Sequence, residues 1–215
     1  MTVTISRLYD NYSAAQQVVN DLEAAGLRSD DISIVANNAD NWYKGDSQSA
    51  RPMAARKDKD HDGKDDRVEG AETGAGIGAV VGGAAGLLAG LGVLAIPGVG
   101  PVVAAGWLAA TALGAVAGGA TGGIVGALTQ AGISKEDAPV YAEGLRRGGT
   151  LVTARISERD RTRYEAILNR SAVDIRERAD AYRNSGWSGF DEKAKPYSSE
   201  EARRERTTYQ PTGLR

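Results

Sequence analysis

A run of carboxylates near residue 60 has the spacing of a calcium-binding loop. Asp58, Asp60 and Asp62 alternate along the chain, Gly63 follows directly, and Glu69 comes six residues after that glycine. In an EF-hand loop, carboxylates at these positions bind the ion and the glycine makes the sharp turn. The sequence therefore predicts a candidate calcium site formed by Asp58, Asp60, Asp62 and Glu69.

The same residues also fit a solvated, charged linker. Position eight of the motif, which is normally apolar, is Asp65, and no amphipathic helix is predicted before the loop. Basic residues are interleaved with the acidic ones, at Lys57, Lys59, Lys64 and Arg67. Such mixing of charge is typical of an ordinary solvated segment. Both interpretations stay open, and a loop that must become ordered on binding would hold calcium weakly.

Other catalytic and binding chemistry has little support in the composition. The chain of 215 residues has no cysteine and a single histidine, His61. Thiolate chemistry is therefore excluded, and Ser-His-Asp catalysis and multi-histidine metal sites are poorly supplied. The formal net charge of −2 argues against nucleic-acid binding through overall positive charge. We expect no enzyme activity, no nucleic-acid partner, no small-molecule substrate and no cofactor other than calcium.

Glycine recurs at every fourth position in the middle of the chain. Residues 73 to 134 contain no Asp, Glu, Lys or Arg. In an α-helix, positions i and i+4 share one face, so glycines at this spacing let another helix backbone approach closely. This small-xxx-small pattern is typical of helices that pack in lipid. The predicted helix-packing glycines are Gly74, Gly78, Gly82, Gly86, Gly90, Gly114, Gly118, Gly122 and Gly126.

Residues 73–133 are predicted to form a helical hairpin. Residues 73–96 and 102–129 are each long enough, at about 1.5 Å per residue, to cross a hydrocarbon core of about 30 Å. Three settings are open: insertion into a membrane, a soluble homo-oligomer of packed hairpins, and a Gly/Ala-rich segment with little fixed structure. We favour the membrane, although insertion would be marginal because large apolar side chains are few. The turn would contain Pro97, Gly98, Gly100 and Pro101.

The first flank of this hairpin, residues 1–38, shows a β-α-β pattern. Alternating β-branched residues predict strands at 2–8 and 32–36. Between them an apolar stripe predicts a helix, and Ser13 with Gln16 three residues later forms a capping-box pattern at its start.

The second flank, residues 134–178, repeats the pattern after a short additional helix. That helix is predicted over 134–149, because serine and aspartate can cap its start and two glycines follow its end. Strands are then predicted at 150–156 and 173–178, with a helix over 158–172 between them.

Two tandem β-α-β units indicate an α+β, ferredoxin-like split fold with the strand order 4-1-3-2. In that order the second strand ends beside the start of the third, so an insertion between them leaves and returns at one end of the sheet. A helical hairpin meets this requirement. Residues 39–72 would be a polar linker and 179–215 a charged tail, both disordered or only locally ordered. In the tail, Trp187 and Phe190 could dock on a partner, but we expect them to rest on the protein's own surface or to stay mobile.

Three stretches of the sequence have a familiar combination: the opening TVTISRLYDNYSAAQQVVNDLEAAGL, the glycine-rich GAETGAGIGAVVGGAAGLLAGLG and the later AGISKEDAPVYAEGLRRGGTLVTARI. With these motifs the chain resembles the bacterial general-stress protein family that includes heat-induced and low-temperature-induced stress proteins. The resemblance covers about residues 1–178 and rests on structural motifs. It implies a small stress-response protein, often regarded as membrane-associated, without catalytic residues to carry over.

We therefore expect a non-enzymatic stress protein that associates with membrane lipid and self-assembles through its glycine-rich hairpin. Its start lacks the apolar core of a signal peptide, which favours the cytoplasmic side of the inner membrane. The alternative is a cytoplasmic, soluble homo-oligomeric scaffold modulated by calcium at the acidic loop.

Overall fold

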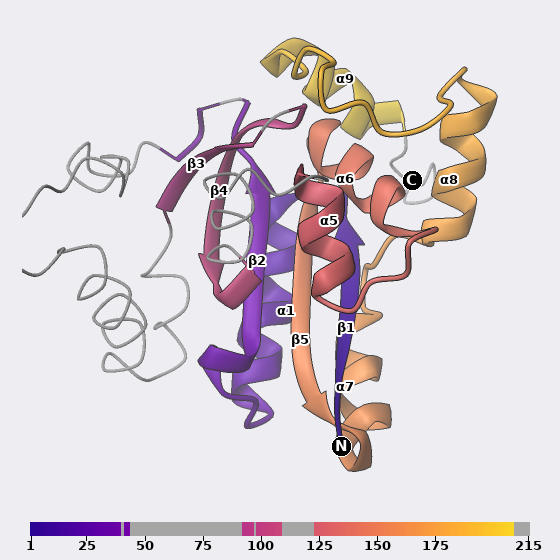
Figure 1. Ribbon diagram of the computed structural model, residues 1–215. Helices are drawn as coiled ribbons and strands as arrows, with labels where there is room; N and C mark the ends of the chain where they lie inside the picture. The colour runs from indigo at the N-terminus through magenta and orange to yellow at the C-terminus, as the bar shows by residue number, and fades with distance from the viewer. Residues whose placement is uncertain (40, 44–91, 97, 109–122, 209–215) are drawn as a thin grey trace, which may run out of the picture.

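The computed structural model describes residues 1–39, 41–43, 92–96, 98–108 and 123–208 (Figure 1). Five strands in these ranges form one antiparallel sheet with the order β1-β5-β2-β4-β3. Their bounds are β1 (Thr2–Tyr9), β2 (Ile32–Asn37), β3 (Gly92–Ile96), β4 (Gly100–Gly106) and β5 (Thr150–Ser157).

The strand β5 joins the two halves of the chain, because it lies between β1 and β2. Tyr9 is paired with Thr150 and Ile34 with Val152. On the far side of β2, Val35 is opposite Ala104 of β4. The order β1-β5-β2 agrees with the predicted neighbours of these three strands, and the overall class is α+β as predicted.

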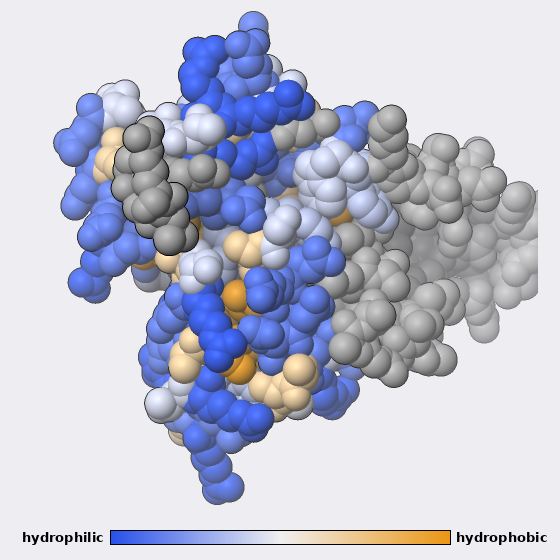
Figure 2. All heavy atoms as spheres, turned by 180° about the vertical axis from the view of Figure 1, so that it is seen from behind, coloured by the Kyte–Doolittle hydropathy of each residue, from blue (hydrophilic) through white to orange (hydrophobic). Residues whose placement is uncertain are grey.

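Helices cover both faces of the sheet (Figure 1). On one face lie α1 (Tyr12–Ala24) and α7 (Arg161–Leu168), which bury residues such as Leu22 in a shared apolar cluster. The other face is covered by α5 (Gly123–Gln130) and α6 (Ala138–Arg146). Figure 2 shows the molecule from behind, where hydrophilic residues dominate the surface and apolar areas are small.

The alternation of side chains along each strand explains the two apolar layers. Leu8 belongs to the cluster under α5 and α6, whereas its neighbour Tyr9 belongs to the cluster under α1 and α7. Val35 and Ile34 of β2 divide in the same way. Successive side chains of a strand point to opposite faces, so a sheet buried on both sides needs apolar residues at consecutive positions.

Two further helices lie outside α6 (Figure 1). They are α8 (Ile175–Asn184) and α9 (Ser199–Thr208). Short 3-10 turns at Ser29–Asp31 and Glu158–Asp160 precede β2 and α7.

The prediction of helices on both sides of the Pro-Gly turn is wrong for residues 92–106, which form the β3–β4 hairpin. The four-residue glycine period is interrupted here, because Gly90 precedes β3 and Gly114 follows β4. The intervening GVLAIPGVGPVVAAG is rich in β-branched valine, which favours strands. Pairing of β4 with β2 then places Val102 and Val103 in buried positions.

The predicted final strand over 173–178 is also wrong, because this segment begins α8. The Asp174 carboxylate accepts hydrogen bonds from the amides of Arg176 and Glu177, at 2.9 and 3.1 Å, and so caps the helix. Contact with the edge of β1 includes one backbone hydrogen bond, from the Val173 amide to the Leu8 carbonyl. The cap stabilises this helix, together with the burial of Ala179 and Tyr182 further along it.

Residues 179–215, predicted to be a disordered or only locally ordered tail, include the last part of α8 and all of α9. Ala179 and Tyr182 are buried. Trp187 packs edge-on against Tyr182, with ring centroids 5.9 Å apart, and Phe190 packs against the cluster under α5 and α6. The expectation that these two aromatic residues rest on the protein's own surface is confirmed.

Two predicted helix starts differ from the structure. The helix α1 is capped by Asn11, whose side chain accepts from the Ala14 amide at 2.9 Å, and not by the predicted Ser13. The helix predicted from residue 134 begins only at Ala138, as α6, and its N-cap Asp137 makes no side-chain capping hydrogen bond. The Ser134 hydroxyl instead accepts from the Asp137 amide at 3.0 Å in the turn before the helix.

Candidate functional site

Most of the site residues predicted from sequence lie outside the described residues. These are the calcium ligands Asp58, Asp60, Asp62 and Glu69, together with Gly74, Gly78, Gly82, Gly86, Gly90, Gly114, Gly118 and Gly122. Gly126 lies in α5. In the part of the chain that the structure describes, no group of three or more His, Cys, Asp or Glu is placed to hold a metal ion. Within the same ranges, no helix combines the length and apolar character needed to span a bilayer.

The predicted turn lies where expected, but it joins two strands. Gly98 and Gly100 have φ angles of +74° and +98°, in the region that favours glycine. The Val99 amide donates to the Ile96 carbonyl at 3.1 Å. Pro97 lies outside the described residues, and Pro101 belongs to β4.

The most elaborate polar arrangement in the described ranges surrounds Glu143, a carboxylate of α6 with no exposed surface. Arg146 binds it with two nitrogens, at 2.9 and 2.6 Å, and the Nε of Arg147 donates to it at 2.6 Å. The helical spacing of three and four residues places both guanidinium groups on the carboxylate. Such charge-assisted hydrogen bonds compensate for the removal of the carboxylate from water.

Arg147 extends this cluster to three other parts of the chain. It forms an ion pair with Glu205 of α9, and its guanidinium lies 4.2 Å from the ring centroid of Tyr182 in α8. The Tyr197 ring lies 5.7 Å away on the connection between these helices. Burial by itself would lower the pKa of Arg147, but hydrogen bonds to Glu205 and Glu143 outweigh it and raise that pKa.

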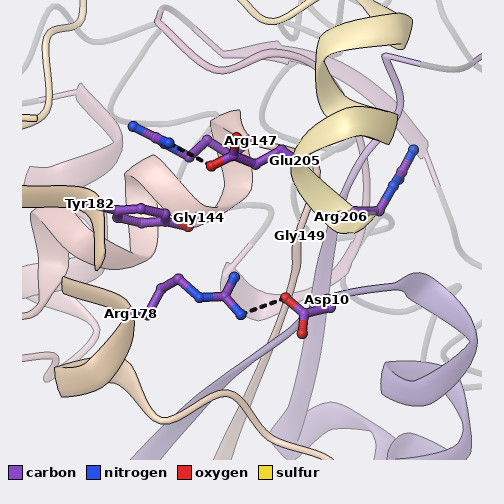
Figure 3. A pocket seen from close by; sticks show the side chains of 8 residues that line it. All are labelled: Asp10, Gly144, Arg147, Gly149, Arg178, Tyr182, Glu205 and Arg206. Atoms are coloured by element: carbon purple, nitrogen blue, oxygen red, sulfur yellow. Dashed lines mark hydrogen bonds and ion pairs between the residues drawn. The ribbon is translucent and has the colours of Figure 1, made fainter. Parts of the chain in front are cut away.

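A small polar pocket adjoins the cluster (Figure 3). Its volume is about 10 Å³, which is room for roughly one water molecule. Opposite Arg147, the Arg178 guanidinium pairs with Asp10 at 2.8 Å. Burial raises the pKa of the Tyr182 hydroxyl above its usual value. The lining residues are Asp10, Gly144, Arg147, Gly149, Arg178, Tyr182, Glu205 and Arg206.

This arrangement is suited to holding elements together. The charged groups that line the pocket pair with one another or with the backbone, as Arg206 does by donating to the Gly148 carbonyl at 3.3 Å. We call Glu143, Arg146, Arg147 and Glu205 the ion-pair clamp, which joins α6 to α9. The sequence does not predict this clamp, because its pattern indicates disorder over 179–215, where Glu205 lies. The spacing of three and four residues from Glu143 to Arg146 and Arg147 is a signal in the sequence for ion pairs within one helix. No such local signal indicates that Glu205 is a partner of Arg147.

The fold and the clamp define an α+β protein with one antiparallel sheet, helices on both faces and a C-terminal segment fastened by ion pairs. Comparison of the chain with protein-family models, with curated proteins and with solved structures finds no match.

Proposed function

We propose that this protein is a non-enzymatic stress-response protein that associates with membranes and with copies of itself through its charge-free, glycine-rich segments. The observation that carries the proposal is the place of these segments in the chain. Residues 73–91 and 109–122 contain no charged residue and directly precede and follow the β3–β4 hairpin. That hairpin forms one edge of the sheet.

In the part of the chain that the structure describes, helices already cover both faces of the sheet, and this supports the proposal. Helices α1 and α7 lie on one face of the sheet, and α5 and α6 lie on the other. The glycine-rich segments are therefore not required to fill the space between these layers. Glycines at a period of four are suited to close contact with a helix of another copy or with a partner in lipid.

We also propose that β1, α1, β2, β5 and α7 are arranged as in a ferredoxin-like fold that lacks its fourth strand.

The non-enzymatic part of the proposal is supported by the way the buried charges are paired. In the described ranges, the buried charged side chains are Glu143 and Arg147, and they pair with each other at 2.6 Å. A catalytic acid or base is generally kept available to a substrate. These two groups instead satisfy one another, as structural charges do.

Flotation of the full chain with phospholipid vesicles tests the proposal. We expect the unmodified protein to float with the vesicles. Gly82→Leu with Gly118→Leu should still float but should lose self-association in the floated fraction, measured by cross-linking, because leucine removes the close helix approach that glycine allows. The matched control is Ala84→Leu with Ala120→Leu, which adds similar bulk two residues away from the glycine period. This control should float and self-associate like the unmodified protein.

Sedimentation without vesicles distinguishes lipid from a second copy of the chain as the binding partner. A uniform oligomer that does not float, and that the glycine variant disrupts, would indicate a soluble assembly in place of membrane association. A protein that neither floats nor associates with itself would overturn the proposal.

A further inference from the structure

Three aromatic side chains meet at one end of the sheet. Tyr12 begins α1 shortly after β1 ends, and Trp42 and Tyr43 follow the end of β2. Strands β1 and β2 both run antiparallel to β5, so their carboxyl ends lie at the same end of the sheet (Figure 1). The topology therefore brings together rings from separate parts of the chain. We call Tyr12, Trp42 and Tyr43 the aromatic cluster.

The rings of the aromatic cluster pack on one another and still face solvent. Trp42 lies on Tyr12 with ring centroids 4.4 Å apart, and Tyr43 meets Trp42 edge-on at 5.9 Å. Trp42 nevertheless keeps 38% of its surface exposed, and among the described residues Met1 is the other exposed large apolar side chain. Exposed tryptophan and tyrosine rings are enriched at contact surfaces and in membrane-interface belts.

Two buried asparagines fix the turn that carries Trp42. Asn37 and Asn38 are each 3% exposed. The Asn38 side chain accepts from the Tyr43 amide and donates to the Tyr43 carbonyl, both at 3.1 Å. The Trp42 indole N–H donates to the Asn37 carbonyl at 2.9 Å, which satisfies the one polar atom of that ring. The exposed part of the tryptophan is therefore apolar carbon, presented on a turn that hydrogen bonds hold in place.

The exposed surface of the aromatic cluster is small. An aromatic side chain can bury about 150 to 250 Å², so three rings that are each exposed by 38% or less present under about 300 Å² together. A stable protein–protein interface buries about 800 Å² on each partner. Tryptophan and tyrosine rings at the boundary between lipid and water need no such area, because each ring inserts singly among the headgroups. The size of the surface thus favours a bilayer over a protein partner.

The aromatic cluster shares its end of the sheet with one end of a charge-free segment. Strand β4 begins beside the end of β2, so the β3–β4 turn lies at this end. Glu192 lies against both Gly98 of that turn and Gly123 at the start of α5. Gly123 directly follows residues 109–122, which the proposed function assigns to lipid or to another copy. A bilayer bound by those residues would meet this end of the sheet.

We propose that the aromatic cluster is an interfacial anchor, which inserts Trp42 among the headgroups of a phospholipid bilayer and holds this end of the sheet at the membrane surface. The inference rests on the proposed function, because the glycine-rich segments bring the chain to lipid. Tyr12 supports the tryptophan ring, and the turn fixed by Asn37 and Asn38 keeps it pointing outward. The three rings are uncharged, so contact does not require anionic lipid.

Brominated phosphatidylcholine tests the anchor directly, because bromine on the acyl chains quenches tryptophan fluorescence at short range. One full-chain reporter keeps Trp42 and carries Trp107→Phe and Trp187→Phe. The matched control keeps Trp187, which packs against Tyr182, and carries Trp42→Phe and Trp107→Phe. We expect brominated vesicles to quench Trp42, and ordinary vesicles to shift its emission to shorter wavelength. The emission of Trp187 should stay unchanged in both.

Binding to ordinary phosphatidylcholine vesicles measures the strength of the anchor. Trp42→Ala in the full chain should weaken vesicle binding about tenfold, which corresponds to burial of about half of the exposed ring surface. Trp42→Phe should weaken binding less, because phenylalanine keeps an aromatic ring on the same turn. Urea unfolding of both variants checks that the fold is retained.

Quenching of Trp42 together with weaker binding of Trp42→Ala would support the anchor. If the unmodified chain floats but either result is missing, the anchor is wrong and the proposed function stands. Loss of self-association by Trp42→Ala without vesicles, with no change in flotation, would make the cluster a protein interface and overturn the anchor. A chain that does not float would overturn both the anchor and the membrane part of the proposed function.

Discussion

At the scale of single residues, the carboxylate of Glu143 is completely buried and is bound by two arginines. Replacement of Glu143 by glutamine would leave the guanidinium of Arg147 buried without this counter-charge. Loss of one partner from a buried ion pair is strongly destabilising. We expect Glu143→Gln to lower the free energy of unfolding by about 3 kcal/mol, measured by urea unfolding.

The control for this prediction is Glu200→Gln, which removes an exposed carboxylate from a helical ion pair. Exposed pairs of this kind contribute about 0.5 kcal/mol or less. Equal effects of the two substitutions would contradict the role assigned to Glu143.

At the scale of elements, α8 shows how a local cap can override a strand pattern. Asp174 caps the helix through two backbone amides. Asp174→Ala should therefore lower the free energy of unfolding by about 1 kcal/mol, as the loss of a helix cap typically does. It should also speed hydrogen exchange of the α8 amides more than exchange in β5. Asp180→Ala, which removes an exposed carboxylate inside the same helix, should change neither measurement to this extent.

Strands β1, β2 and β5 were predictable from sequence because buried, β-branched residues recur in short runs bounded by turn residues. Strands β3 and β4 were not predicted, because glycine recurs at every fourth position before and after them and this pattern favours helices. The prediction of helix was applied to the residues between, which include Val102 and Val103. Their structure depends on pairing with β2, which is a tertiary interaction. The class of the fold thus follows from local patterns, whereas the edge of the sheet does not.

The clamp was only half predictable for a related reason. The spacing of Glu143, Arg146 and Arg147 on one helix is a local signal. Glu205 and Tyr182 contact Arg147 through the packing of the last two helices. Nothing in the sequence around these two residues indicates that Arg147 is their partner.

At the scale of the whole molecule, the described layers should fold without residues 44–91. Gly92 and Val35 both pair with Ala104 from opposite sides, which places them about 10 Å apart across β4. Tyr43 is held near β2 by a hydrogen bond from its amide to Asn38. A flexible Gly/Ser linker of about 12 residues spans about 19 Å, enough to connect Tyr43 to Gly92.

We expect the chain with this linker to keep the circular dichroism spectrum of the sheet and the cooperativity of urea unfolding. The same replacement should weaken vesicle flotation, because it removes Gly74 to Gly90. Loss of cooperative unfolding would contradict the conclusion that the layers form a complete core.

The position of β5 also determines when the sheet can form during synthesis. Strand β1 pairs with β5, so residues 2–9 wait for residues 150–157 to leave the ribosome before they gain this partner. Contacts between distant parts of a chain form late, because the intervening loop must be closed first. Exposed apolar surface in such unfinished chains is open to other binding partners. The charge-free glycine-rich segments are thus synthesised before the sheet that they interrupt can close, and the proposed binding to lipid or to a second copy would begin in that interval.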